Sequence, residues 1–212
     1  MSENKWIDIT QPLTNDIAHW PGDTPFSFEL ACTKKETGSV NIGQITSSVH
    51  MGTHVDAPFH FDDNGTTIDQ LDVNIYIGKA AVIDVSHVTN ITPKLLEGYK
   101  WEDDVTRILL RTSLPNNPKR FPKELPVLDP AIAPFLQQKE IKLLGVDMPS
   151  VDAPDSNELA THHALHDNGI YILENIMLDH ISAGHYELIA LPLAIQGADG
   201  SPVRAVIRRI EK

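Results

Sequence analysis

The sequence HMGTHVDAPFH, residues 50–60, places three histidines and one aspartate within eleven residues. Imidazole nitrogen and carboxylate oxygen are ligand types that suit zinc, manganese and iron. A regular helix does not fit the whole segment, because its glycine and its proline both interrupt one. We therefore expect the end of a strand that runs into a loop, where Gly52 lets the backbone fold so that His50, His54 and Asp56 converge on a metal.

His60, the last residue of this segment, has two interpretations. It is either a further ligand or a general acid or base beside the metal, the role that histidine fills most often near neutral pH. A single histidine is more often a surface residue or a hydrogen-bonded core residue than a ligand. Three histidines with an aspartate at this spacing nevertheless favour a metal or catalytic site.

A predicted helix later in the chain carries three more histidines. Asp155 or Ser156 is expected to cap its start, and the helix stops near residue 168. His162 and His166 are four residues apart and would lie on one face of this helix, where they form a candidate metal pair of their own. Asp152, in the turn before the helix, is expected to be a structural carboxylate.

Two other residues, Glu174 and Trp20, each have two interpretations. Glu174 lies in an apolar stretch, and a carboxylate there is costly to bury unless it is paired or coordinates a metal. A salt bridge to an arginine such as Arg204 is the alternative. Trp20 stands in a loop just before a Pro-Gly pair, where it is either a buried structural residue or an aromatic wall for a flat substrate.

Taken together, these stretches resemble a known family. The pattern H-x-G-T-H-x-D-x-P-x-H over residues 50–60 is similar to the signature of the cyclase-type metal-dependent hydrolases. Within that superfamily, the chain resembles the bacterial kynurenine formamidases (arylformamidases) along nearly its full length. The supporting stretches are WIDI (6–9), WPGD (20–23), GVD (145–147), HH (162–163), ILEN (172–175) and GSPVR (200–204).

The resemblance implies a pair of zinc ions, with manganese as the other candidate metal. The implied ligands number five, more than one catalytic zinc with an open position needs, and they are His50, His54, Asp56, His162 and Glu174. Asp56 and Glu174 would bridge the ions, and His60 would move protons. Trp20 would lie against an aryl group. The resemblance gives His166 no role and makes His163 a neighbour of the site.

The implied activity is the hydrolysis of N-formyl-L-kynurenine to L-kynurenine and formate, in tryptophan breakdown, by a homodimer with a β/β/α arrangement. Two alternatives stay open. One is a related enzyme that opens a cyclic amide such as isatin with manganese, and the other is a non-catalytic metal-binding protein. His60 beside a full ligand set argues against the second, because a structural site closes its coordination and needs no spare acid-base group.

Length and composition set the class of protein. The chain has 212 residues, 41% of them hydrophobic and 22% charged, as in one ordinary globular domain. The net charge of -12, without a cluster of Lys or Arg, argues against a nucleic-acid-binding protein. No apolar run approaches the length of a membrane span, and the first residues lack the layout of a signal peptide, so we expect a cytoplasmic protein.

The pattern of apolar residues predicts one α/β domain over residues 1–212, with a mixed, strand-rich sheet core and a few short helices. Val40, Ile42 and Ile45 are expected core positions. A turn at residues 198–200 is expected to form a hairpin before the closing strand. The predicted strands are 6–9, 26–33, 40–49, 80–85, 107–111, 141–146, 169–175, 186–195 and 203–210; the helices are 92–99, 129–139 and 155–168; an exposed loop is expected at 114–126.

Overall fold

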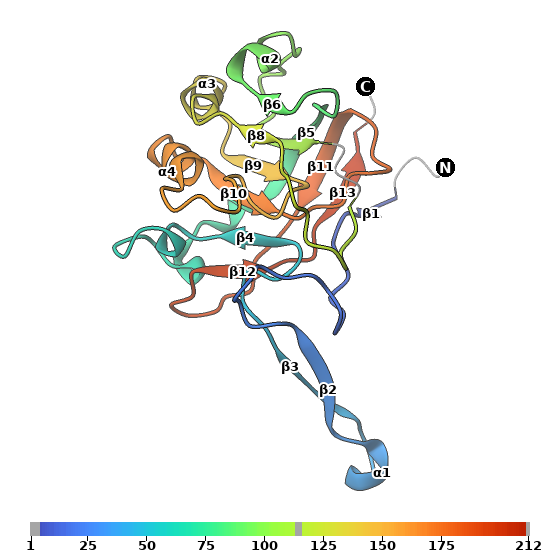
Figure 1. Ribbon diagram of the computed structural model, residues 1–212. Helices are drawn as coiled ribbons and strands as arrows, with labels where there is room; N and C mark the ends of the chain where they lie inside the picture. The colour runs from blue at the N-terminus through green and yellow to red at the C-terminus, as the bar shows by residue number, and fades with distance from the viewer. Residues whose placement is uncertain (1–4, 113–115, 211–212) are drawn as a thin grey trace.

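A nine-stranded mixed sheet runs through the body of the molecule (Figure 1), in a computed structural model that describes residues 5–112 and 116–210. The strand order is β1-β13-β11-β5-β7-β9-β10-β4-β12. The four adjacent strands β5, β7, β9 and β10 are parallel to one another. All other neighbouring strands of this sheet are antiparallel. The bounds are β1 Ile7–Asp8, β4 His54–Asp56, β5 Ile77–Asp84, β7 Arg107–Arg111, β9 Leu143–Val146, β10 Tyr171–Glu174, β11 Gly184–Ile189, β12 Gly200–Pro202 and β13 Val206–Arg209.

Both faces of the central strands are buried, which explains their near-continuous apolar sequences. Because side chains alternate along a strand, Ala80 and Val82 of β5 join the apolar cluster on one face, and Ala81 joins the cluster on the other. The curled sheet encloses the first cluster. Three short helices lie along the second face (Figure 1), and they are α2 Pro93–Glu97, α3 Ile132–Gln138 and α4 Ala160–Asp167.

The remaining described elements are short. Strands β6 Asn90–Ile91 and β8 Val127–Leu128 form a two-stranded parallel sheet. Three 3₁₀ helices, η1 Pro58–His60, η2 Ile68–Gln70 and η3 Val73–Tyr76, follow β4 and lead into β5. In the predicted loop 114–126, residues 114 and 115 lie outside the described residues, and residues 116–126 contain no helix or strand. No helix in the described part of the chain is long and apolar enough to span a membrane.

A hairpin arm projects from the body (Figure 1), and it corrects one prediction. The arm consists of β2 Ser27–Cys32, α1 Lys34–Thr37 and β3 Ile42–Thr46. The prediction that Val40, Ile42 and Ile45 are core positions is wrong, because these side chains are 53%, 48% and 65% exposed. An apolar strand pattern predicts that a strand has an apolar face, but it does not say which element covers that face.

The chain after β11 corrects a second prediction. The strand expected over residues 186–195 ends at Ile189. It pairs antiparallel with the closing strand as expected, but through a broad connection that contains β12 and not through a tight turn at residues 198–200. Gly200 instead begins β12, which crosses the molecule to pair with β4, so that Gly200 lies opposite Asp56. This pairing between distant parts of the chain has no local sequence signal, and it places Asp199 beside the histidine-rich segment.

Candidate metal centre

The histidine-rich segment folds as a tight turn followed by a short strand. Gly52 adopts φ +60°, in the left-handed region that disfavours residues with a side chain. A Cβ at this position would also lie 2.9 Å from Leu13 Cδ2. The turn directs His50 back over β4, whose residues His54 and Asp56 point to the same face of the sheet because they are two apart.

Glu174 joins this face through strand pairing. Strand β10 is antiparallel to β4, and Glu174 lies directly opposite His54. Their neighbours on the other face, Val55 and Leu173, are fully buried in the apolar core. Polar side chains therefore gather on one face of the β4–β10 pair because the apolar side chains between them fix the register.

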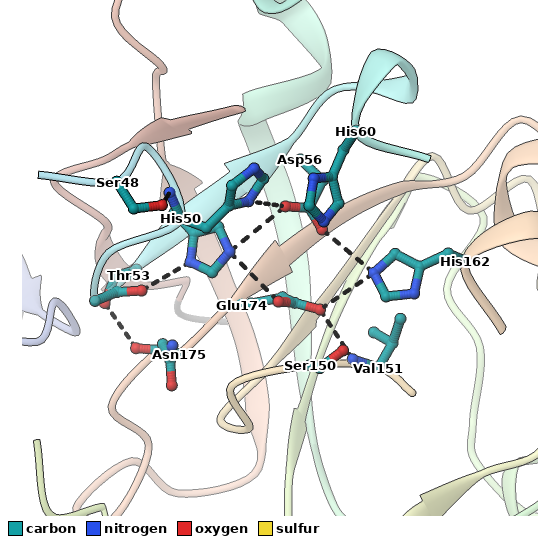
Figure 2. A network of polar contacts seen from close by, with 12 residues as sticks. Ser48, His50, Thr53, Asp56, His60, Ser150, Val151, His162, Glu174 and Asn175 are labelled. Carbon is teal, nitrogen blue, oxygen red and sulfur yellow. Dashed lines mark hydrogen bonds and ion pairs between the residues drawn. The ribbon is translucent and has the colours of Figure 1, made fainter. Parts of the chain in front are cut away.

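The contacts among these side chains are short, and Figure 2 shows them around one common space. His50 Nδ1 lies 2.9 Å from Asp56 Oδ1, and His54 Nε2 lies 3.5 Å from the same oxygen. His54 Nε2 is also 3.4 Å from Glu174 Oε2. Helix α4 adds His162, whose Nε2 lies 3.7 Å from Asp56 Oδ2 and 3.9 Å from Glu174 Oε1.

Outer hydrogen bonds fix which ring nitrogens face this space. His54 Nδ1 donates to the carbonyl oxygen of Gly52 at 2.8 Å, and His162 Nδ1 donates to Asp152 Oδ2 at 2.7 Å. Both Nε2 atoms therefore point to the carboxylates with a lone pair available to a metal. The backbone N–H of Val151 donates to Glu174 Oε1 at 2.8 Å, which orients that carboxylate.

Asp152 also corrects the predicted cap of α4. Neither Asp155 nor Ser156 is the cap; the helix starts after Leu159, which has φ +45° and makes no side-chain cap. The carboxylate of Asp152 instead accepts hydrogen bonds from the backbone N–H groups of Thr161 and His162, each at 3.0 Å. One carboxylate thus satisfies the first turn of α4 and orients the imidazole of His162.

Electrostatics show that the centre attracts positive charge. Burial alone lowers the pKa of His54, but hydrogen bonds with Asp56 and Glu174 outweigh it and raise the pKa to about 10. Burial also lowers the pKa of His162, but the hydrogen bond with Asp152 and the nearby carboxylate of Asp56 outweigh it and raise the pKa to about 10. The pKa values of these imidazoles rise because carboxylates surround them. Without a metal they hold protons near neutral pH, and a bound cation must displace those protons.

The donor set fits one or more divalent cations. Asp56 Oδ2 is buried and has no hydrogen-bond partner among the described residues, which is costly unless another group binds it. At the edge of the centre, His50, His60 and Asp199 offer ligand atoms that lie within 4.8 Å of one another. Two further sets of this kind overlap and contain the predicted ligands: His50, His54 and Asp56 in the first, and Asp56, His162 and Glu174 in the second. Asp56 belongs to both, so the five predicted ligands come together in the fold.

His60 lies at the edge of the centre. Its ring packs on that of His50 with a centroid distance of 3.9 Å, and its side chain is 34% exposed. Burial and the nearby charge of His50 lower the pKa of His60, so its imidazole is neutral at neutral pH and can accept a proton.

Asp199 is a site residue that the sequence reasoning missed. Its Oδ2 lies 2.9 Å from His50 Nε2 and 3.4 Å from His60 Nδ1, so one carboxylate contacts both rings. The hydrogen bond with His50 is the main reason that the pKa of Asp199 falls to about 2. In the sequence this residue has the appearance of an ordinary turn aspartate, and only the pairing of β12 with β4 brings it here.

The other candidates lie outside the centre. His163 and His166 contact the ring of Phe61 at centroid distances of 5.5 and 5.6 Å and belong to none of these ligand sets. His162 thus joins the centre without His166, and the described residues give the candidate pair of these two histidines no further ligand. The alternative partner of Glu174 is wrong as well, because Arg204 forms an ion pair with Asp8.

A cavity of about 830 Å³ gives access to the centre. His54, His162 and Glu174 line one part of it, and Trp20 lines another. Trp20 contacts Phe121 edge to face, with ring centroids 5.3 Å apart. The volume lies in the range of small-molecule sites, so the cavity can hold a flat aromatic molecule between these rings and the candidate ligands.

The sequence matches the model of one protein family and is similar to proteins that carry a function in their names. The sequence model of the family described as "Putative cyclase" matches residues 7–153. A protein of Bacillus cytotoxicus named kynurenine formamidase is 57% identical over 208 residues, which cover 98% of this chain and 99% of that protein. A protein of the same name from Bacillus cereus is 58% identical over 210 residues, which cover 99% of this chain and 100% of that protein.

Solved structures confirm the predicted α/β fold. The structure of a potential metal-dependent hydrolase with cyclase activity aligns with a TM-score of 0.83 and 25% identity, covering 99% of this chain and 100% of that one. Isatin hydrolase A from Labrenzia aggregata, bound to benzyl benzoate, aligns with a TM-score of 0.82 and 26% identity, covering 99% of this chain and 95% of that one.

Proposed function

The chain belongs to the cyclase family, and from this we propose that it is a metal-dependent formamidase that hydrolyses N-formyl-L-kynurenine to L-kynurenine and formate in tryptophan breakdown. The observation that carries the proposal is a buried set of imidazoles and carboxylates, centred on Asp56, that lines a cavity with an aromatic wall. Two relatives that are 57% and 58% identical over nearly the whole chain carry the name of this activity.

We assign two zinc ions to the centre, with manganese as the alternative. The first would be held by His50, His54 and Asp56, and the second by Asp56, His162 and Glu174, because these are the two sets of converging donors that share Asp56. A bound divalent cation supplies Lewis acidity, which polarises a carbonyl oxygen and lowers the pKa of water from about 15.7 toward about 7.

The side chains around the centre have separate tasks in this reaction. Hydrolysis breaks the bond between the formyl carbon and the amide nitrogen that is attached to the aryl ring. The oxygen of water leaves in formate, and the nitrogen gains a proton to become the free amine. His60 accepts the proton from water and donates it to the leaving nitrogen, as its lowered pKa allows. Asp199 holds the ring of His60 in place through Nδ1. Trp20 packs against the aryl ring and excludes water.

We further propose that residues 1–212 act as one cyclase-like domain in a cytoplasmic homodimer. The arm formed by β2 and β3 supports the dimer. Phe28, Leu30 and Ile45 are exposed on it, and an isolated two-stranded hairpin is marginally stable in water. A second copy that covers this apolar face would stabilise the arm.

The proposed function predicts a clear substrate preference. Purified protein, loaded separately with zinc and with manganese, is assayed for formate from N-formyl-L-kynurenine and for ring opening of isatin. We expect formate release, with kcat/KM at least about 100-fold above that for isatin, since a linear formamide and a cyclic amide place the carbonyl differently against the same walls. Isatin as the better substrate would identify a cyclic-amide hydrolase, and inactivity on both would favour a binding protein.

A further inference from the structure

We propose that Arg120 recognises a carboxylate on the substrate and thereby selects formamides that carry an amino-acid side chain. The inference rests on the proposed formamidase activity and names the part of the cavity that distinguishes its substrate from simpler aryl formamides. It concerns the cavity wall made by residues 18–23 and 116–124, which includes none of the candidate metal ligands.

This wall is held in a defined position. The backbone N–H of Ala18 donates to the carbonyl oxygen of Pro118 at 2.6 Å, which joins the two segments. Trp20 and Phe121 pack edge to face across the same junction. Asn116 Nδ2 donates to the carbonyl oxygen of Ile176 at 2.8 Å, which ties the second segment to the body near Glu174. Side chains on this wall therefore keep a fixed relation to the centre.

Within the described residues, two arginines, Arg120 and Arg209, make no side-chain hydrogen bond or ion pair, and of these two only Arg120 lines the cavity. Other arginines contact acceptors: Arg107 donates to backbone carbonyls, and Arg111, Arg204 and Arg208 pair with Asp84, Asp8 and Glu187. The guanidinium of Arg120 makes no hydrogen bond or ion pair within residues 5–112 and 116–210, yet Arg120 lines the cavity. In a chain with a net charge of -12, a free guanidinium at a cavity wall indicates a site for an anionic group.

The chemistry of the substrate matches this arrangement. N-formyl-L-kynurenine carries its formamide on an aryl ring and, on the neighbouring ring position, a side chain that ends in an α-amino acid. With the formamide at the metal centre and the ring against Trp20 and Phe121, the carboxylate reaches the wall that carries Arg120. A guanidinium binds a carboxylate through two parallel hydrogen bonds, which gives both affinity and orientation. The same wall carries Lys123 and the carboxylates of Asp23 and Glu124, so it is the guanidinium of Arg120, and not a net positive charge of the wall, that would bind the carboxylate.

The test compares two substrates that differ by one group. The first is N-formyl-L-kynurenine, and the second is its decarboxylated analogue, which keeps the ring, the formamide and the amine. For the wild-type protein we expect kcat/KM to be at least about tenfold lower for the analogue, the scale of a hydrogen bond to a charged group. Equal values for the two substrates would overturn the proposal, and this comparison needs no variant to fold.

A variant then assigns the effect to Arg120. Arg120→Gln should raise KM for N-formyl-L-kynurenine about tenfold or more and leave the kinetics of the analogue unchanged, because only the carboxylate loses a partner. The matched control is Lys119→Gln, which removes one positive charge from the residue just before Arg120. The ammonium of Lys119 is exposed and pairs with Asp16. An equal loss on both substrates, or an equal loss in the control, would contradict the assignment. A wild-type protein inactive on both substrates would instead reject the formamidase activity itself.

Discussion

Replacing Asp56 with asparagine is expected to lower kcat/KM for N-formyl-L-kynurenine by at least about 10³-fold and to remove most of the bound metal. Losing a residue that merely orients a ligand typically costs about 10- to 100-fold in metal affinity or activity. Asp56 belongs to both sets proposed to hold zinc, so its loss affects both proposed ions at once. Metal content by plasma mass spectrometry and steady-state kinetics give the two readouts.

The structure explains why the loss of Asp56 should have a larger effect on metal content and activity than the loss of a neighbouring residue. The nearby imidazole of His162 and the hydrogen bond with His50 overcome burial and hold the pKa of Asp56 well below its usual range, so it is charged at neutral pH. An asparagine keeps the shape and removes this charge. The matched control is Asp63→Asn, in the exposed turn that follows the motif, which should keep both metal and activity. Full metal content in Asp56→Asn would contradict the shared-ligand arrangement.

Replacing His60 with alanine is expected to lower kcat by about 10² to 10⁴-fold, the usual contribution of a general acid or base. Metal content should not change, because His60 lies at the edge of the centre, near His50 and Asp199, and belongs to neither of the two sets proposed to hold zinc. This separation of activity from metal content distinguishes a proton-transfer role from a ligand role. A variant that loses metal in proportion to activity would show that His60 is a ligand.

Two companion variants sharpen this test. Asp199→Asn should lower kcat by about 10- to 100-fold, as expected for a residue that orients a catalytic ring. It should also change the dependence of kcat on pH, since Asp199 contacts the imidazole that transfers the proton. His163→Ala is the control, because it removes another exposed histidine near the centre. Among the described residues the ring of His163 contacts one aromatic ring, that of Phe61, so the variant should leave kcat and KM unchanged.

The local part of the site could be predicted from the sequence. The spacing of His54 and Asp56 places both side chains on one face of a strand, and Gly52 allows the turn that returns His50 to them. The central strands were also predictable, because burial on both faces leaves continuous apolar runs such as residues 80–83. These features depend on neighbours in the chain, which a sequence pattern records directly.

The parts that depend on distant pairing could not be derived in this way. Glu174 meets His54 because β10 pairs with β4, and only the family resemblance pointed to that meeting. Asp152 and Asp199 resemble ordinary turn carboxylates in the sequence, and their partners lie nine or more residues away. The exposed face of the arm was misread for the same reason, since a strand pattern does not reveal what covers the strand.

The central claim is that a pair of cations shares Asp56 and that Glu174 helps to hold one of them. Anomalous diffraction at the zinc absorption edge, from crystals grown with zinc, tests it most directly. The account predicts two anomalous peaks between the two carboxylates, on the order of 3.5–4 Å apart, as in two-metal hydrolases. Peaks elsewhere, such as beside His166 on the surface of α4, with none between Asp56 and Glu174, would contradict it.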